Sequence, residues 1–498
     1  MTNRAIEITL ILLLIFTPLA LGSQVLWAFS LMELGIILIV ILWVLGELGY
    51  RPSATRPLTG NKFEIPPNPQ SQIRNPKPII PLTIALLSLC LAFVLLQMIP
   101  LPEGVVKLIS PKTYELRNQL TAIVYSQSSN LKPQSQFITL SLFPLGTKIE
   151  FLKWLALVGI FLFLLRWRLP DNGHRLASHL IVTVFLVGAF ESVYGIFEFF
   201  SGHRHILTMD FSGLIRSVQG TFANRNYFAG YLLMVIPLSM GFFFARQENQ
   251  PWRFGNWRGR LTSLDGKSTL LGFGLILMIL GLLLSASRAG ILCLLIAFTV
   301  ITLLFRRTGP EQRVSGLPAI TFALGLLWAS WIGLDAVMNR FFTVSQSLGE
   351  RWVIWIATLE ILKDFPLFGS GLGTFTEVFP MYRFFHARGL FTHAENDFLQ
   401  LASEVGLLGV APIAILFLFL FSKAISGIRS LSMGEPGRYV AIGGLVGILA
   451  LMFHSLVERN IQVPANAFLY TVVWAIVLRS ACDAGITRRG DRTPDNRD

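Results

Sequence analysis

The chain alternates between long apolar blocks and shorter polar stretches as far as about residue 480. The apolar blocks run for roughly 16 to 24 residues, the length that an α-helix rising about 1.5 Å per residue needs to cross a bilayer core. The alternating strands of an outer-membrane barrel are absent, so the pattern predicts an all-α bundle. We expect about 12 membrane spans, near residues 8–22, 26–45, 79–99, 149–166, 178–200, 227–245, 269–285, 289–305, 317–334, 403–421, 439–456 and 464–479.

Composition and charge support this reading and give the bundle an orientation. Hydrophobic residues make up 53% of the chain and charged residues 14%, which excludes an ordinary soluble protein. With a cytoplasmic N-terminus, 25 of the 41 Lys and Arg residues fall in the inner segments, so both termini are predicted to be cytoplasmic. The net charge of +13 is then an orientation signal rather than a nucleic-acid site. The first apolar block also resembles a signal peptide, but the loop parity requires that it is retained.

Two outer segments are long enough to build a structure, at about 100–148 and 335–402. In the second, the stretch from Arg351 to Asp364 has apolar residues at helical spacing, namely Trp355, Leu359 and Leu362. We interpret it as a short helix at the interface that ends at Pro366. The following GSGLGTF contains a GxGxG pattern, but no strand precedes it, so it is interpreted as a tight turn rather than a phosphate loop.

Arginines stand at the predicted outer ends of three segments. Arg288 lies in SASRAG between two apolar blocks, Arg225 lies in GTFANRNYFAGYL at the mouth of the sixth span, and Arg351 opens the short helix. Ionisable groups at membrane depth cost roughly 2.5 to 3.5 kcal/mol each on insertion scales. Three guanidinium groups on one face would bind a polyanion such as a pyrophosphate. Interfacial anchoring of the same side chains is the alternative.

Acidic and imidazole groups gather at the same predicted face. His393, Glu395 and Asn396 lie in THAENDFLQLASEVGLLG at the entrance to the tenth span, and we expect Glu395 to share a helix face with Leu399. His454 and Glu458 form a second pair at the outer end of the eleventh span. A carboxylate beside an imidazole is a candidate general base, although acidic residues also stabilise helix N-termini. We therefore predict binding roles for Asn396, His454 and Glu458.

Several of these motifs occur together and in a fixed order. They are GTFANRNYFAGYL, SASRAG, RWVIWIATLEILKDFPLFGSGLGTF, HAENDFLQLASEVGLLG and HSLVERNIQVPAN, between Gly220 and Pro464. In this order the chain resembles the O-antigen ligase and O-antigen polymerase superfamily of bacterial inner-membrane glycan transferases. The resemblance implies about twelve spans with a long periplasmic loop between the ninth and tenth. It also implies a metal-independent GT-C-type reaction, in which a glycan on undecaprenyl pyrophosphate passes to an acceptor hydroxyl.

The resemblance assigns roles to particular residues. The family's pyrophosphate-binding arginines correspond to Arg288 and Arg351, with Arg225 as a third. Ligases of the family commonly have His followed by Asn where this chain has Glu395 and Asn396, and His393 stands two residues earlier. Either Glu395 replaces that His, or His393 acts instead, or no base is essential. The expected catalytic residues are therefore Glu395 and His393.

These observations predict three regions and one activity. They are the N-terminal helices (1–200), a catalytic membrane region (201–480) that includes the periplasmic loop 335–402, and a disordered cytoplasmic tail (481–498). The predicted activity is ligation or polymerisation of surface polysaccharide, such as O-antigen or exopolysaccharide, at the inner membrane. No cofactor and no metal are expected. The expected partners are the lipid-linked glycan donor, a glycan or lipid-linked acceptor, the bilayer and polysaccharide-assembly proteins. A multi-span transporter of a small anion or polysaccharide precursor is the rival.

Overall fold

The computed structural model describes residues 2–49, 79–127, 137–167, 174–202, 205–207, 209–210, 217–247, 265–306, 323, 344–385 and 391–482. Its long helices are α1 (Thr2–Leu19), α2 (Leu26–Gly49), α3 (Ile79–Met98), α6 (Pro144–Arg166), α7 (His174–Ser201), α8 (Arg225–Gln247), α10 (Gly266–Leu284), α11 (Arg288–Arg306), α14 (Val344–Asp364), α16 (Asp397–Ser430), α17 (Pro436–His454) and α18 (Pro464–Cys482). Shorter helices are η1 (Leu21–Ser23), α4 (Glu103–Ile109), α5 (Pro111–Gln127), α15 (Phe375–Val378) and η4 (Phe379–Met381). Strand β1 (Leu101–Pro102) pairs antiparallel with β2 (Phe137–Ile138), and β3 (His205–Ile206) with β4 (Met209–Asp210).

The prediction of a helical, polytopic membrane protein is confirmed. Within the described ranges, eight helices are long and apolar enough to cross a bilayer: α2, α3, α7, α8, α10, α11, α16 and α17. Helices α1, α6 and α18 also stand where spans were predicted, but they are not among these eight. The ninth predicted span, 317–334, lies almost entirely outside the described residues. The number of twelve spans and the position of the long loop stay predictions.

Helix α8 forms the centre of the bundle because small residues allow α17 to approach it closely. A Cβ on Gly241 would lie 2.3 Å from the Tyr439 carbonyl oxygen, and one on Gly443 would lie 2.3 Å from that of Pro237. Gly447, four residues further along α17, meets the Met234 carbonyl at 2.9 Å in the same way. Small residues four apart are the usual means of close helix packing in lipid, where apolar side chains gain little from leaving the solvent.

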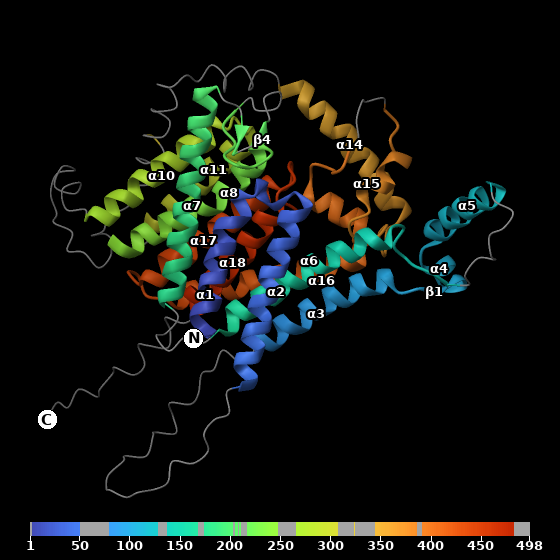
Figure 1. The fold of residues 1–498 in the computed structure, drawn as a ribbon, viewed down its shortest axis with the longest axis horizontal. Helices are drawn as coiled ribbons and strands as arrows, with labels where there is room; N and C mark the ends of the chain where they lie inside the picture. Colours follow the sequence, from blue (N-terminus) through green and yellow to red (C-terminus); the bar gives the residue numbers. More distant parts are fainter. Residues whose placement is uncertain are drawn as a thin grey trace, which may run out of the picture.

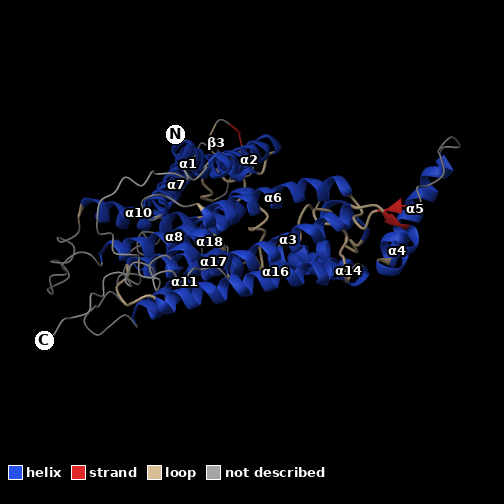
Figure 2. Ribbon diagram, turned by 90° about the horizontal axis from the view of Figure 1, so that it is seen from below, coloured by secondary structure: helices blue, strands red, loops and turns tan. Residues whose placement is uncertain are grey.

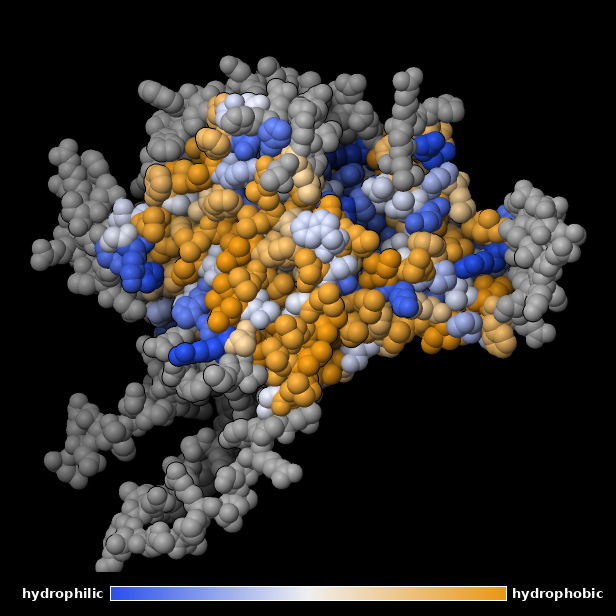
Figure 3. Space-filling view, in the orientation of Figure 1, coloured by the Kyte–Doolittle hydropathy of each residue, from blue (hydrophilic) through white to orange (hydrophobic). Residues whose placement is uncertain are grey.

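The bundle presents apolar surface outwards and carries extra elements at one end. In Figures 1 and 2, α14 and the α4–α5 hairpin lie at the end of the molecule away from the C-terminus. Figure 3 shows a largely hydrophobic surface over the main bundle. On α2, for example, Leu26 is 75% exposed and Leu34 is 61% exposed. Such a surface is stable only against lipid.

Helix α16 is broken one third of the way along. Gly406 has φ 64°, and an added Cβ there would lie 2.4 Å from the Leu367 backbone. The GSGLGTF loop and the residues just before it close the gap. Amides of residues 370–371 donate to the carbonyls of Ser403 and Glu404, and amides of residues 407–408 donate to those of Pro366 and Leu367, at 2.8–3.1 Å. The freed backbone groups of a membrane helix are thus satisfied by protein.

Two expectations for α14 were wrong in detail. The helix begins at Val344 rather than at Arg351, so Arg351 lies in its second turn. The buried residues of its described part are Ile354, Ala357, Thr358 and Ile361, whereas Leu359 is 44% exposed. The helical period was predicted correctly, but the wrong helix face was predicted to be buried. Ala357 is small and Thr358 is polar, so both have a weak hydrophobic signal although both are fully buried. The helix ends before Pro366, as predicted.

Candidate active site

The charged residues singled out in the sequence stand on five segments that meet at one end of the bundle. These are the first turns of α8 and α11, the loop before α16, the N-terminal half of α14, and the turn after α17. A Cβ on Gly290 would lie 3.0 Å from that of Ala229, so α11 starts against α8. A Cβ on Gly230 would lie 2.1 Å from Oδ1 of Asn460, so the turn after α17 also touches α8. Figure 3 shows hydrophilic side chains in a recess between the main bundle and the α14–α15 region.

Arg351 and Glu458 form an ion pair that joins α14 to the turn after α17. Nη2 of Arg351 donates to Oε1 of Glu458. The Glu458 side chain is 4% exposed and that of Arg351 is 26% exposed. Burial raises the pKa of Glu458, and the Arg351 guanidinium and the nearby Asn226 side chain lower it again. The carboxylate thus orients a guanidinium that remains accessible from outside.

Arg459, the next residue, contacts His393. A guanidinium nitrogen of Arg459 meets Nε2 of His393, and its carbon lies 5.8 Å from the centre of the Tyr227 ring. Burial, and next to it the charge of Arg459, lower the pKa of His393 to about 2. A guanidinium only donates hydrogen bonds, so Nε2 of His393 is the acceptor and the ring is neutral at physiological pH. His393 holds Arg459 in place.

Glu395 lies in the loop before α16 and not on the helix, which corrects the expected helix face shared with Leu399. Its backbone has φ 52°, a left-handed conformation that is costly for a residue other than glycine. The preceding residue, Ala394, is buried; its carbonyl accepts from Nε1 of Trp355 at 3.0 Å, and its amide donates to Oε1 of Gln400 at 3.0 Å. The negative charge of Glu395 contributes, after burial, to raising the pKa of Glu458.

Asn396 and Asp397 fix this loop to the rest of the site. Oδ1 of Asn396 accepts from the amides of Phe398 and Leu399 at 3.1 and 3.0 Å, an N-cap of α16. Oδ2 of Asp397 accepts from the amides of residues 460 and 461 at 2.8 and 2.7 Å, and its own amide donates to Ser455. The predicted binding residue Asn396 therefore has a structural role here, and its contact with a ligand stays a prediction.

His454 is buried beneath the site, where it connects α11 to the turn after α17. Its Nε2 lies 3.5 Å from Oγ of Ser287, and its Nδ1 lies 3.2 Å from Nδ2 of Asn460. Arg288 follows Ser287 directly, begins α11 and is partly exposed. Because His454 is 0% exposed, it reaches a substrate only through these neighbours.

Arg225 begins α8 beside the same turn. It is partly exposed, and the amide of the next residue, Asn226, donates to Oδ1 of Asn224 at 2.8 Å. Two residues later the Tyr227 carbonyl accepts from Nδ2 of Asn466 at 3.1 Å, which fixes this end of α8 to α18. Arg225, Arg288 and Arg351 thus lie on segments that are connected by direct contacts. Arg216, the other arginine near this mouth, lies outside the described residues.

The GSGLGTF loop encloses a carboxylate of its own protein. The amides of Gly373 and Phe375 donate to the two oxygens of Glu404 at 2.9 and 3.3 Å, and Nε2 of Gln400 donates at 3.1 Å. The Leu372 amide donates to Oε1 of Gln97 on α3 at 3.0 Å. The three glycines of the GSGLGTF loop all have positive φ. The interpretation as a tight turn is confirmed, because these amides are already used.

Three residues that contribute to the site, Arg459, Asp397 and Glu404, were not distinguished by the sequence pattern. Arg459 stood beside Glu458 in an exposed-looking turn, and Asp397 and Glu404 were two of many polar residues at the start of a helix. The distinguishing signal for Asp397 and Glu404 is burial, at 5% and 3% exposure, which a single sequence does not display. Among the described residues, no group of three or more His, Cys, Asp or Glu side chains is placed to hold a metal ion.

The comparison with known families bears on the segments just described. Residues 273–414, from α10 into α16, match the family model described as O-Antigen ligase. Over these residues the chain is similar to that family. Its resemblance to that superfamily is thereby confirmed. The matched stretch contains Arg288, Arg351, His393 and Glu395, whereas the partner residues on α8 and after α17 come from outside it. A search of curated proteins found no match to the chain.

Proposed function

We propose that this O-antigen ligase-type protein transfers a glycan from undecaprenyl pyrophosphate to an acceptor hydroxyl, without a metal ion, at the periplasmic face of a bacterial inner membrane. Both termini are then cytoplasmic. The observation that carries the proposal is the meeting of arginines, a carboxylate and an imidazole at one end of the bundle, within and around the matched stretch. The activity is ligation or polymerisation of surface polysaccharide.

The arginines form the part of the site that binds the glycan donor. Arg351, oriented by Glu458, and Arg288, at the first turn of α11, bind the pyrophosphate, with Arg225 beside them. In the reaction the acceptor oxygen bonds to the anomeric carbon while the bond from that carbon to the pyrophosphate oxygen breaks. The pyrophosphate leaves with the electron pair, and guanidinium groups stabilise the charge that develops on it.

Glu395 is the better candidate for the base that takes the acceptor proton. The lone pair of Nε2 on His393 is directed at Arg459, and burial holds the pKa of this ring near 2. Protonating His393 would place a cation against a guanidinium. Glu395 is partly exposed, lies in the same loop and is free of such a contact with Arg459 among the described interactions. We therefore assign the proton to Glu395 and a positioning role to His393.

The transporter alternative has one observation in its favour, the broken helix α16. Transporters often place such breaks at a substrate cavity near the midplane. Here, however, the groups freed at Gly406 bond to residues 366–371, and the adjacent Glu404 bonds to the GSGLGTF loop. The break is filled by protein, which favours the enzyme.

The test is glycan transfer by the purified protein in nanodiscs, with an undecaprenyl-pyrophosphate glycan as donor, alone and with a second acceptor. We expect release of undecaprenyl pyrophosphate. A ladder from the donor alone identifies a polymerase, and product only with a separate acceptor identifies a ligase.

The same assay tests the site. Arg288→Gln and Arg351→Gln are expected to abolish release, whereas Lys363→Gln is expected to leave it unchanged. Lys363 is the matched control because it lies on α14 with Arg351, but its side chain is 68% exposed and pairs with Glu360. Absence of release by wild-type protein with a competent donor would support the transporter. Full activity of both arginine variants would refute the assignment of the site.

A further inference from the structure

A cavity lies at the end of the bundle opposite the candidate active site. Its volume is about 1000 Å³, at the upper end of the range for ligand pockets. Helix α8 connects the two sites, since Arg225 begins it at the active site and Arg246 ends it at the cavity. A helix of 23 residues is about 35 Å long, so the sites are separated by about the thickness of a bilayer. The cavity therefore belongs to the other leaflet.

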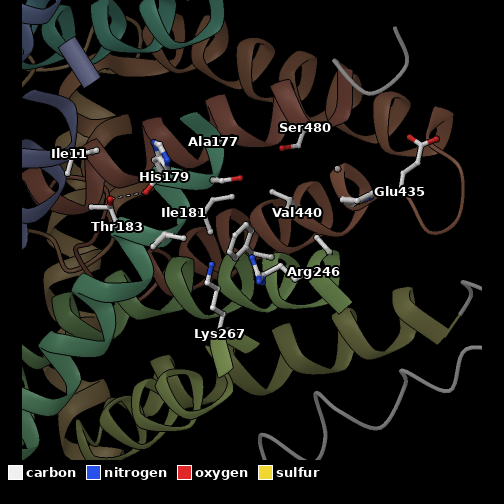
Figure 4. A pocket seen from close by; sticks show the side chains of 16 residues that line it. Ile11, Ala177, His179, Ile181, Thr183, Arg246, Lys267, Glu435, Val440 and Ser480 are labelled. Atoms are coloured by element: carbon white, nitrogen blue, oxygen red, sulfur yellow. Dashed lines mark hydrogen bonds between the residues drawn. The ribbon is translucent and has the colours of Figure 1, made fainter. Parts of the chain in front are cut away.

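The lining of the cavity is apolar along one part and cationic at another. Its apolar residues come from four helices: Ile11 on α1, Ile181 on α7, Phe242 on α8 and Val440 on α17. Arg246 of α8 and Lys267 of α10 line it too, and in Figure 4 their side-chain nitrogens are directed towards the same space. Glu435, at the far side in Figure 4, points away from them.

The two cations retain capacity to bind an anion. Nη2 of Arg246 lies 3.2 Å from Oδ2 of Asp265, while its Nε is buried and has no hydrogen-bond partner among the described residues. Lys267 forms no ion pair with any residue that the structure describes. His179, which also lines the wall, is already bonded through Nδ1 to Glu7 at 2.6 Å. A buried N–H of a guanidinium without an acceptor costs free energy, which a ligand oxygen would remove.

We propose that this cavity binds an anionic phospholipid from the leaflet opposite the active site. The phosphate lies between Arg246 and Lys267, and an acyl chain follows the apolar wall formed by Ile11, Ile181 and Phe242. Charge complementarity favours an anionic headgroup over a zwitterionic one. Basic pockets between membrane helices are suited to such headgroups.

The experiment measures thermal unfolding of the full chain in detergent against added phosphatidylglycerol, phosphatidylcholine or inorganic phosphate. Native mass spectrometry of the same preparations counts retained phospholipid. We expect stabilisation by phosphatidylglycerol, and an apparent affinity about fivefold weaker for each cation removed in Lys267→Gln and in the Arg246→Gln and Lys267→Gln double variant. Lys267 is exposed and carries no described contact, so Lys267→Gln is expected to fold normally.

Arg429→Gln is the matched control. Arg429 is an exposed arginine in the last turn of α16, and it is not part of the cavity lining. Equal stabilisation of wild type and double variant would overturn the proposal, as would equal stabilisation by phosphatidylcholine. A full effect of inorganic phosphate alone would assign the cavity to a soluble anion instead. Glycan transfer is measured separately, so failure of the lipid site leaves the proposed activity open to its own test.

Discussion

Two buried glutamates, Glu404 and Glu458, lie near the same end of the bundle and serve it differently. Glu404 accepts from two backbone amides and the Gln400 amide, all from its own surroundings. Glu458 pairs with one guanidinium, which remains 26% exposed. The first carboxylate uses its bonding capacity to close a loop, and the second orients a cation towards the outside. Burial alone therefore does not mark a functional carboxyl; the exposure of its partner does.

The largest effect is expected from Glu404→Ala. The change leaves the amides of Gly373 and Phe375 and that of Gln400 without their acceptor, so we expect a loss of about 3–5 kcal/mol of stability. Thermal unfolding in detergent measures it. Transfer per folded molecule is expected to stay near wild type, which separates this carboxylate from Glu458. Glu377→Ala, at an exposed position of α15, is the control. An unchanged unfolding temperature would contradict the loop-closing role.

Glu395→Gln is expected to reduce transfer about 100-fold, which corresponds to about 2.7 kcal/mol of barrier, with little change in stability. Glutamine keeps the size of the side chain and its polar contacts, but it does not take a proton. Steady-state kinetics at saturating donor measures kcat. Activity within twofold of wild type would remove Glu395 from the base role.

The lowered pKa of His393 predicts how the stability of the protein varies with pH. Because its folded pKa is about 2, the unfolded chain, with a pKa of about 6.5, binds more protons at acidic pH. Stability is therefore complete above pH 6.5 and falls below it, by about 2 kcal/mol at pH 5. In His393→Gln this component disappears, so the variant is expected to lose less stability than wild type between pH 7 and pH 5. Parallel curves for the two proteins would show that His393 titrates freely.

The smallest effect is expected from Arg351→Lys. Lysine keeps the charge that pairs with Glu458 but lacks the planar fork that binds two phosphate oxygens. We expect transfer to fall about tenfold, mainly through KM for the donor, and stability to change by less than about 1 kcal/mol. A lysine variant with wild-type KM would show that position 351 contributes charge alone.

The sequence predicted a bundle of membrane helices and drew attention to several residues of the proposed site, because both leave local signals. Apolar blocks mark membrane helices, and Arg288 and Arg351 stand out as charges at their ends. The acceptor of the GSGLGTF amides was unpredictable, because Glu404 lies some thirty residues away in the chain. The left-handed backbone of Glu395 was missed for a similar reason. Contacts of Ala394 with Trp355 and Gln400 hold it there, against the local preference for continuing the helix.

Gln97 has a consequence for how the protein is made. On α3, its Nε2 bonds to the carbonyls of Phe368 and Glu404, which follow it by 271 and 307 residues. At about 5–20 residues per second, a ribosome needs roughly 15–60 s to supply these partners. During that time the side-chain amide of Gln97 lies in an inserted helix without these two acceptors. We therefore expect nascent chains that end before residue 400 to have α3 in the membrane but a protease-sensitive GSGLGTF segment, which becomes resistant only when α16 is complete.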